Sequence, residues 1–249
     1  MLKSVIFDMD GVIIDSEPQH ARAALRVFAK YNLPVDLSYC KSFIGSSTKN
    51  MAESTIREFD MPVSADELLL ELNKEKKILL EEEGYQVLPG VVELIQTLYR
   101  AGIRLAIASS SSPSEIEHVV KTLKIKKYFD KLISSGHVKH PKPAPDTFEL
   151  ALKEMGCSPK ETIVIEDSCN GCLAAKAAGL TCVGYVNLHS GKQDLSKADV
   201  LLESFEGIDE RFFHHVLARS LGTPVTIADT KRLLIRELTP DDIKAIYSI

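Results

Sequence analysis

Three absences narrow the functions open to this chain of 249 residues. Five cysteines, an odd number in an otherwise ordinary composition, fit reduced thiols better than a disulfide framework. The formal net charge is -5, and no segment gathers the basic side chains that nucleic acid or a membrane surface requires. No apolar run is long enough for a transmembrane helix, and the chain opens on an apolar strand rather than a signal peptide. We therefore expect a cytoplasmic protein without nucleic acid or membrane as partner.

The most informative segment is an apolar strand that ends in two acidic residues. Residues 4–7 have the composition of a buried parallel strand, and such strands carry their chemistry at the carboxyl end. Asp8 and Asp10 follow there on one side of the chain, and Gly11 lets the backbone leave the sheet. Two close carboxylates repel each other unless a cation or a shared proton relieves them, and Mg²⁺ prefers oxygen ligands. A bare D-x-D is more often a polar loop, so the residues downstream decide.

Residues 8–16 read D-M-D-G-V-I-I-D-S and resemble the first motif of the haloacid dehalogenase-like hydrolases, D-x-D-G-[VT]-[LI]-x-D-[ST]. The next four residues, Glu-Pro-Gln-His at 17–20, are similar to the β-phosphoglucomutase-like and sugar-phosphatase branch of that family. The resemblance implies an α/β fold, a Rossmann-like doubly wound parallel sheet with an inserted all-helical cap domain. It also implies an enzyme, a phosphomonoester hydrolase.

The three other motifs of that family occur in order along the chain. A second apolar strand ends in Ser109, where the family places the hydroxyl that holds a phosphoryl oxygen. The string P-K-P-A-P-D matches the family's K-P-x-P-[DE] form and supplies Lys142. A third apolar strand ends in Glu166 and Asp167 and leads into a helix of small residues. Together these motifs predict a phosphoryl-transfer centre, where catalysis is mostly positioning and charge neutralisation.

The resemblance assigns a role to each of these residues. Asp8 would attack phosphorus to give an aspartyl-phosphate, and Asp10 would protonate the leaving alcohol and then activate water. Ser109 and Lys142 would neutralise and orient the phosphoryl oxygens. One Mg²⁺ would be held by Asp8, by the backbone carbonyl of Asp10 and by Asp167, as the only cofactor.

A helical insertion separates the first two motifs. From residue 16 to residue 87 no buried strand is predicted, and apolar residues recur at helical spacing. Within it, Ser64-Ala65-Asp66-Glu67 has the form of a capping box that begins a helix. We expect a sheet domain at 1–15 and 88–218 and a cap domain at 16–87. Such a cap would exclude water and select the substrate.

The substrate-binding candidates lie mostly in this cap. Residues 43–49 form the expected specificity loop, in which a glycine allows close approach of the backbone to a ligand. Cap lysines are candidate cations for the substrate, although lysines on a helical cap are more often only solvated. In the sheet domain, the acidic residue before Asp167 is expected to be a further metal ligand or to lie behind one. The full set is Gly45, Lys49, Lys76, His20 and Glu166.

Three functions remain open at this stage. We favour a Mg²⁺-dependent phosphatase whose partner is a small phosphorylated metabolite, with sugar phosphates as first candidates. A β-phosphoglucomutase reading is weaker, because that family has an arginine after the cap glycine where this chain has Thr48-Lys49. A non-catalytic binding or regulatory module is disfavoured by the intact acidic residues. The sequence assigns no oligomeric state and is compatible with a monomer.

The sheet domain should be complete near residue 218, which leaves 219–249 as a C-terminal extension. Residues 230–242 (TKRLLIRELTPDD) resemble the opening strand and helix of the GNAT acetyltransferases, T-x-R-L-x-L-R-x-[LF]-x-x-x-D. The chain ends before the glycine-rich turn that would hold the acetyl-CoA pyrophosphate, so we expect no acetyl transfer. The extension is either the truncated start of such a domain or a strand and helix packed on the hydrolase.

Overall fold

Six parallel strands form one sheet in the computed structural model, which describes residues 1–43, 48–229 and 232–238. The strands lie in the order β3-β2-β1-β4-β5-β6, so the winding reverses next to β1. The predicted α/β class with a doubly wound parallel sheet is confirmed. The bounds are β1 Ser4–Phe7, β2 Arg104–Ser109, β3 Lys131–Ser134, β4 Thr162–Glu166, β5 Thr181–Tyr185 and β6 Val200–Leu202.

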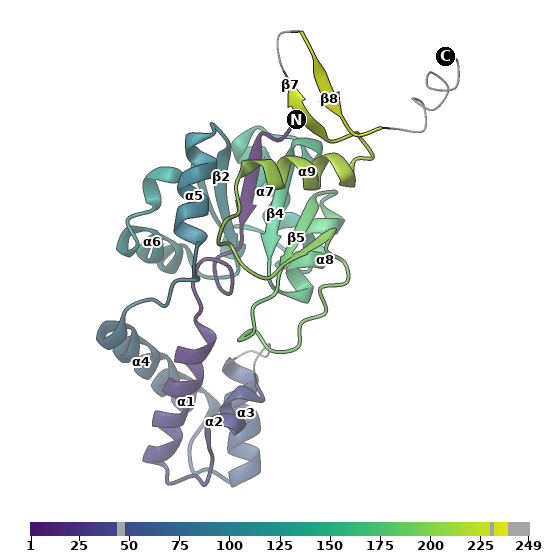
Figure 1. Ribbon diagram of the computed structural model, residues 1–249. Coiled ribbons are helices and arrows are strands. Elements are labelled where there is room, and N and C mark those ends of the chain that lie inside the picture. Colours follow the sequence, from purple (N-terminus) through teal and green to yellow (C-terminus); the bar gives the residue numbers. More distant parts are fainter. Residues whose placement is uncertain (44–47, 230–231, 239–249) are drawn as a thin grey trace.

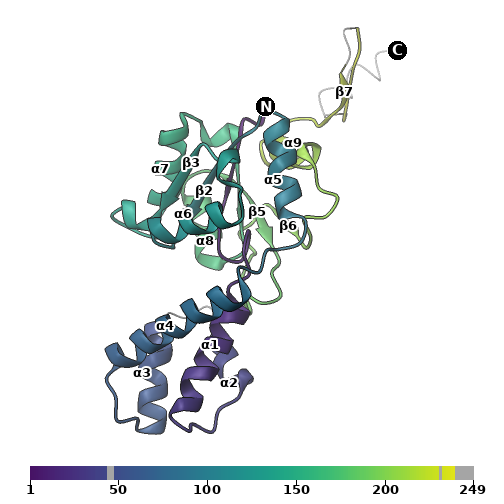
Figure 2. The ribbon, with the colours of Figure 1, turned by 90° about the vertical axis from the view of Figure 1, so that its left-hand side faces the viewer.

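Helices cover both faces of this sheet (Figures 1 and 2). Side chains alternate between the two faces along a strand, so Val5 and Phe7 pack on one side and Ile6 on the other. On the first side lie α5, α6 and α9, and on the second lie α7 and α8. The helix bounds are α5 Val91–Arg100, α6 Pro113–Thr122, α7 Asp146–Met155, α8 Cys169–Ala177 and α9 Glu210–Ser220, with short 3₁₀ turns at Lys126–Tyr128, Ser135–His137 and Pro159–Glu161.

The helical cap forms a separate lobe below the sheet in Figure 1. It has its own hydrophobic core, built around Phe28, Leu68 and Leu72. The predicted capping box is present, because the Ser64 hydroxyl accepts from the backbone N–H of Glu67 and the Glu67 carboxylate accepts from the Ser64 N–H. The cap helices are α1 Glu17–Lys30, α2 Leu37–Lys41, α3 Thr48–Phe59 and α4 Ala65–Glu83, of which α2 is an addition to the prediction.

Two linkers join the lobes, and they are hydrogen-bonded to each other. The Asp15 N–H donates to the Gln86 carbonyl at 2.8 Å, and the Leu88 N–H donates to the Ile13 carbonyl at 3.1 Å. The cap therefore enters and leaves the sheet domain at one point, directly after the first motif.

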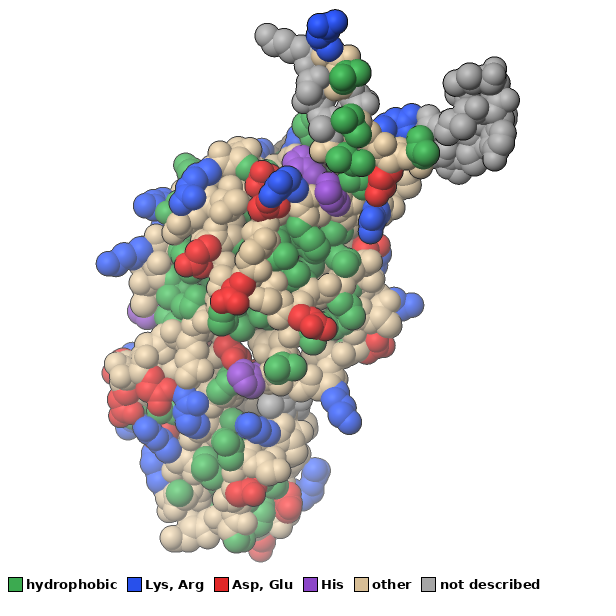
Figure 3. Space-filling view, in the orientation of Figure 1, with side chains coloured by type: hydrophobic (Ala, Val, Ile, Leu, Met, Phe, Trp, Pro, Cys, Tyr) green, Lys and Arg blue, Asp and Glu red, His purple; other side chains and the backbone are tan. Residues whose placement is uncertain are grey.

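The chain beyond α9 forms an antiparallel hairpin of β7 (Thr226–Asp229) and β8 (Leu234–Arg236), which projects from the sheet domain in Figure 1. Its hydrophobic side chains Ile227, Leu233 and Ile235 are exposed, and Figure 3 shows hydrophobic side chains on the surface in this part of the molecule. The helix predicted after the strand lies outside the described residues, and the GNAT resemblance stays a prediction.

Acidic and basic side chains are interspersed on the face shown in Figure 3. Within the described residues, no helix combines the length and the apolar character needed to cross a membrane.

Candidate active site

Lys142 ties together the ends of the three central strands. Pairing of Phe7 with Ile107 and with Ile165 brings the strand ends level, so the next residues of β1, β2 and β4 meet at one edge. The Lys142 ammonium donates to Asp8 Oδ1 at 2.5 Å, to Glu166 Oε1 at 2.6 Å and to the Ala108 carbonyl at 2.9 Å. An ammonium has three donors, and all three are used. The side chain is only 5% exposed, so the positive charge of Lys142 is held in a fixed position at the edge of the sheet.

Negative charge exceeds positive charge around this lysine. Oxygens of Asp8, Glu166 and Asp167 lie within 4.8 Å of one another, and all three residues are buried. Burial and the neighbouring Glu166 carboxylate raise the pKa of Asp167 to about 7. Burial, Glu166 and Asp167 also raise the pKa of Asp8, although Lys142 opposes them. Burial lowers the pKa of Lys142, but Asp8 and Glu166 outweigh it and raise that pKa above its ordinary value.

The donor set therefore fits a hard divalent cation. Three carboxylates with one ammonium leave an excess of negative charge in a buried site, and Mg²⁺ takes carboxylate oxygens as ligands. Glu166 contributes less freely than the two aspartates, because its Oε2 already accepts from the Ser168 hydroxyl at 2.9 Å and from the Asp167 N–H at 3.1 Å. Asp8 and Asp167 are the carboxylates best placed to hold the metal.

Two glycines make room for these carboxylates. A Cβ at Gly11 would lie 1.9 Å from Asp167 Oδ2, and the backbone there has a φ of +85°, a region that L side chains rarely adopt. A Cβ at Gly171, in the first turn of α8, would lie 1.8 Å from the Glu166 carboxyl carbon. Larger residues at either position would displace the acidic cluster itself.

Asp10 lies beside the cluster and is held by two hydroxyl groups. The Ser16 hydroxyl donates to Asp10 Oδ1 at 3.0 Å, and the Ser111 hydroxyl donates to Oδ2 at 2.6 Å. Ser109, at the end of β2, is buried, and its hydroxyl accepts from the Ser111 N–H at 3.0 Å. Ser111, after β2, and Ser16, at the end of the first motif, thus hold the carboxylate of Asp10, the candidate acid–base, from two sides.

A cavity of about 180 Å³ lies over these groups. It brings together six residues predicted from the sequence, Asp8, Asp10, Ser109, Lys142, Glu166 and Asp167. It is also lined by residues to which the sequence assigned no role, Ser16, Glu17, Ser110, Ser168, Ser190 and Gln193. Such a volume suits a phosphoryl group and its immediate surroundings.

Lys76 is a cap lysine on α4 that, like Lys49, does not line the cavity. Burial lowers its pKa, and the carboxylates of Glu17 and Asp10 act in the opposite direction. Its Nζ donates to the Thr48 hydroxyl at 3.0 Å. His20 lies near Lys76, and burial together with that charge lowers the His20 pKa to about 3. The imidazole is therefore neutral at physiological pH and available as a hydrogen-bonding group.

The other cap candidates have a different standing. Lys49 is 66% exposed at its side chain, and its ammonium lies 3.9 Å from Glu53 one turn along α3. It does not line the cavity. Gly45 falls outside the described residues, as does most of the predicted specificity loop. Both remain predictions.

Sequence reasoning missed the segment after β5, residues 186–199, which we term the β5–β6 loop. Its Ser190 hydroxyl donates to Asp167 Oδ2, and its Gln193 side chain accepts from the Cys169 N–H at the start of α8 at 3.1 Å. The signal that would have found them is topological. β5 is a neighbour of β4 in the parallel sheet, so polar residues after its carboxyl end lie at the same edge.

The fold and this edge define a class of enzyme, a phosphoryl-processing hydrolase built on a doubly wound sheet. Residues 5–185 match the model of the haloacid dehalogenase-like hydrolase family, and the chain belongs to that family. It is 32% identical to validoxylamine A 7'-phosphate phosphatase of Streptomyces hygroscopicus subsp. limoneus, over 82% of this chain and 94% of that protein. It is 34% identical to fructose-1-phosphate phosphatase YqaB of Escherichia coli, over 72% and 94% of the two chains. The predicted phosphomonoester hydrolase class is confirmed.

Solved structures have the same fold. CbbY from Rhodobacter sphaeroides, crystallised in complex with xylulose-(1,5)bisphosphate, superposes with a TM-score of 0.68 at 28% identity, covering 83% of this chain and 96% of that one. A β-phosphoglucomutase from Clostridium difficile gives a TM-score of 0.69 at 24% identity, covering 89% of this chain and 100% of that one, a similarity of fold.

Proposed function

We propose that this protein is a Mg²⁺-dependent phosphatase that hydrolyses the phosphate ester of a small sugar or polyol through an aspartyl-phosphate. The observation that carries the proposal is the ammonium of Lys142 shared between Asp8 and Glu166, with Asp167 beside them in the same buried cluster. This arrangement provides a nucleophile, a fixed cation and an excess of negative charge that accepts a metal. The sugar and polyol phosphatases among its relatives support the substrate class.

The chemistry divides between two neighbouring aspartates. Asp8 would attack phosphorus, with Lys142 orienting its carboxylate and neutralising charge that develops on the phosphoryl oxygens. Asp10 would give a proton to the leaving alcohol and take one from the water that hydrolyses the intermediate. Its two serine donors keep the carboxylate directed at the cavity. Ser109 would donate to a phosphoryl oxygen from the end of β2.

Asp8, Asp167 and the Asp10 backbone carbonyl would hold the metal, with Glu166 behind them. When bound, Mg²⁺ would reduce repulsion among the carboxylates and draw charge from the phosphoryl group. The raised pKa values of Asp8 and Asp167 support this, because a divalent cation is what restores their ionised forms at neutral pH.

The substrate would reach this site beneath the cap. Lys76 would add a second cation on the cap side, and His20 a neutral hydrogen-bonding group. One cation and one imidazole suit a monophosphate ester with hydroxyl groups. After the cap glycine, where the β-phosphoglucomutases have an arginine, this chain has Thr48-Lys49. This favours hydrolysis over a mutase reaction, which must hold a second phosphate.

The test is phosphate release from a panel of sugar and polyol phosphates, measured with Mg²⁺ and with chelator. Asp8→Asn should lose activity by about 10⁴-fold or more, since the nucleophile is removed. Asp66→Asn, an exposed position on α4, is the matched control and should retain full activity. Acid-quenched enzyme should carry one phosphoryl group by intact mass, and Asp8→Asn should carry none.

Two results would overturn the proposal. Conversion of glucose-1-phosphate to glucose-6-phosphate without phosphate release would make the protein a mutase. Absence of both reactions across the panel would leave a binding or regulatory module.

A further inference from the structure

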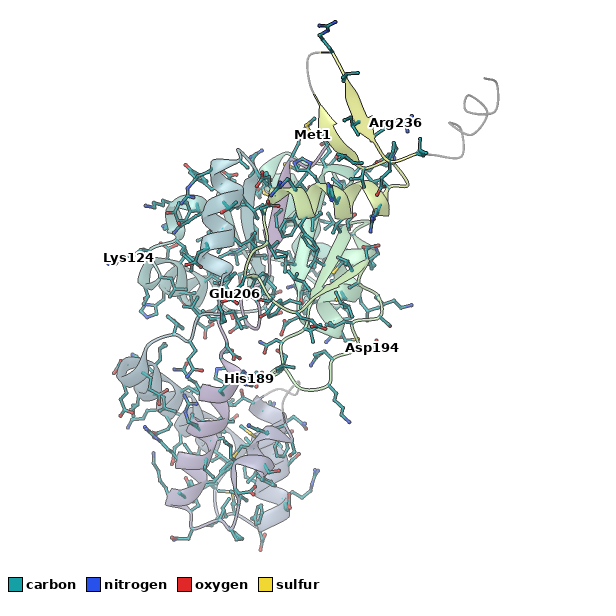
Figure 4. The ribbon with its side chains drawn as sticks, in the orientation of Figure 1. Met1, Lys124, His189, Asp194, Glu206 and Arg236 are labelled. Atoms are coloured by element: carbon teal, nitrogen blue, oxygen red, sulfur yellow. The ribbon has the colours of Figure 1, made fainter. Side chains whose placement is uncertain are left out.

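The β5–β6 loop contacts three separate parts of the active-site edge within four residues. The Asn187 side chain donates to the Gly11 carbonyl at 3.2 Å, in the turn of the first motif. His189 Nδ1 lies 2.5 Å from Asp15 Oδ2, and the Ser190 hydroxyl donates to Asp167 Oδ2. Figure 4 places His189 at the junction of the sheet domain and the cap. One short segment therefore reaches both the cap linkers and a candidate metal ligand.

The Asp15 contact lies at the linkers themselves. Asp15 is buried, and its N–H donates to the Gln86 carbonyl of the returning linker. Its other carboxylate oxygen, Oδ1, is buried without a hydrogen-bond partner among the described residues, so the carboxylate depends on His189. Because an ionised carboxylate only accepts, Nδ1 of His189 carries the proton in this contact. The β5–β6 loop thus holds a buried carboxylate at the cap linkers.

Hydrogen bonds within the loop hold the residues that make these contacts. The His189 N–H donates to Asn187 Oδ1 at 2.8 Å, and the Gln193 side chain donates to the Ser190 carbonyl at 2.9 Å. Asn187 and Ser190 are both buried. His189 and Ser190 are adjacent in the chain, so a backbone shift at His189 also moves Ser190.

We infer that the β5–β6 loop couples the cap linkers to the metal site, with His189 and Ser190 as positioning residues. Ser190 fixes the orientation of Asp167 toward the metal, and His189 holds the loop against Asp15. Loss of His189 should weaken metal binding although His189 touches none of the candidate ligands. The inference rests on the proposed Mg²⁺ site, and it assigns to this loop a role beyond connecting β5 to β6.

The experiment measures Mg²⁺ binding to the full chain by calorimetry in the absence of substrate. Ser190→Ala should weaken binding about tenfold, as is typical for loss of a group that orients a metal ligand. His189→Ala should weaken it about three- to tenfold. The double variant should bind about as weakly as Ser190→Ala alone, because both changes act through the same hydroxyl. Lys192→Ala, an exposed position in the same loop, is the matched control and should bind like wild type.

A conservative variant separates positioning from folding. His189→Asn puts an amide nitrogen near the place of Nδ1 and should recover binding to within about twofold of wild type. Unchanged binding in His189→Ala, or multiplicative losses in the double variant, would overturn the coupling while leaving the proposed function intact. Absence of Mg²⁺ binding by the wild type would overturn both.

Discussion

The sheet edge and the cap face the same cavity but are built differently. At the sheet edge short contacts join the charged groups, as the three acceptors of Lys142 show, and Asp8, Glu166 and Asp167 are buried. On the cap side, Lys76 is described by one hydroxyl contact and by longer-range charge interactions. In the proposed mechanism the chemical step is fixed by the sheet domain, and substrate recognition falls to a cap that is attached through two linkers.

We expect the largest effect from a substitution of Lys142, on the sheet side of the comparison. Lys142→Met should lower activity about 10³-fold or more, because a fixed cation at the phosphoryl group is lost. It should also lower the free energy of unfolding by about 3–5 kcal/mol, since Asp8 and Glu166 remain buried without their partner. Denaturant unfolding of the metal-free protein measures the second effect.

The control is Lys131→Met, which removes a lysine from an exposed pair with Glu154. That change should cost no more than about 1 kcal/mol. Equal losses of stability in the two variants would mean that burial does not distinguish the pairs.

The pH dependence of stability tests the excess of negative charge at the site, through Asp167. Its pKa is about 7 in the folded, metal-free protein against an ordinary value of 3.8. The folded state holds this proton more tightly than the unfolded state, so the contribution favours folding at low pH and is lost as the pH rises from about 4 to about 7. Asp167→Asn should therefore stabilise the chelator-treated protein at pH 8 by roughly 1–3 kcal/mol and leave it nearly unchanged at pH 4.

Mg²⁺ binding should depend on the protonation of Asp167. Mg²⁺ competes with the proton, so the apparent affinity of the wild type should rise about tenfold per pH unit below pH 7 and level off above. A pH-independent Mg²⁺ affinity between pH 5 and pH 8 would contradict the assignment of Asp167.

Lys76 tests the cap side of the comparison. Lys76→Met should lower kcat/KM about 10- to 100-fold, because one partly buried cation near Asp10 is lost while the nucleophile is untouched. Lys77→Met, the exposed neighbour on α4, is the matched control. Steady-state kinetics on the best substrate of the panel, with thermal unfolding alongside, measures both. A loss as large as that of Lys142→Met would remove the distinction between the lobes.

Lys49 should give the smallest effect. Its ammonium is exposed and lies 3.9 Å from Glu53, and exposed pairs of this kind contribute little. We expect Lys49→Met to change kcat/KM by no more than about fivefold, measured on the same substrate. A larger loss would support the sequence prediction that Lys49 is a cation that binds the substrate.

The sequence was most informative where a residue follows directly from a strand end. Asp8 and Asp167 come immediately after a buried strand and Ser109 is the last residue of one, and parallel pairing brings such ends together without further information. Lys142 was found from a motif, yet its bond to the Ala108 carbonyl depends on strand register, which no motif contains.

The cap and the loops were less predictable for physical reasons. The Ser64 capping box is a local interaction, and its prediction is confirmed. Lys49 and Lys76 both lie on cap helices, and helical periodicity does not say which one faces the other lobe, because that depends on how the cap is rotated. Ser190 lies in a segment without regular structure, so no period gives its path to Asp167.

The paired linkers have an evolutionary consequence. Because Asp15 and Gln86 are bonded to each other, the whole cap is an excursion between two neighbouring points of the backbone. An insertion at such a place requires no rearrangement of strand order, since the strands on either side are already aligned without it. Helical caps of other sizes and shapes can therefore replace one another on an unchanged sheet, and a lineage can change its substrate without rebuilding its catalyst.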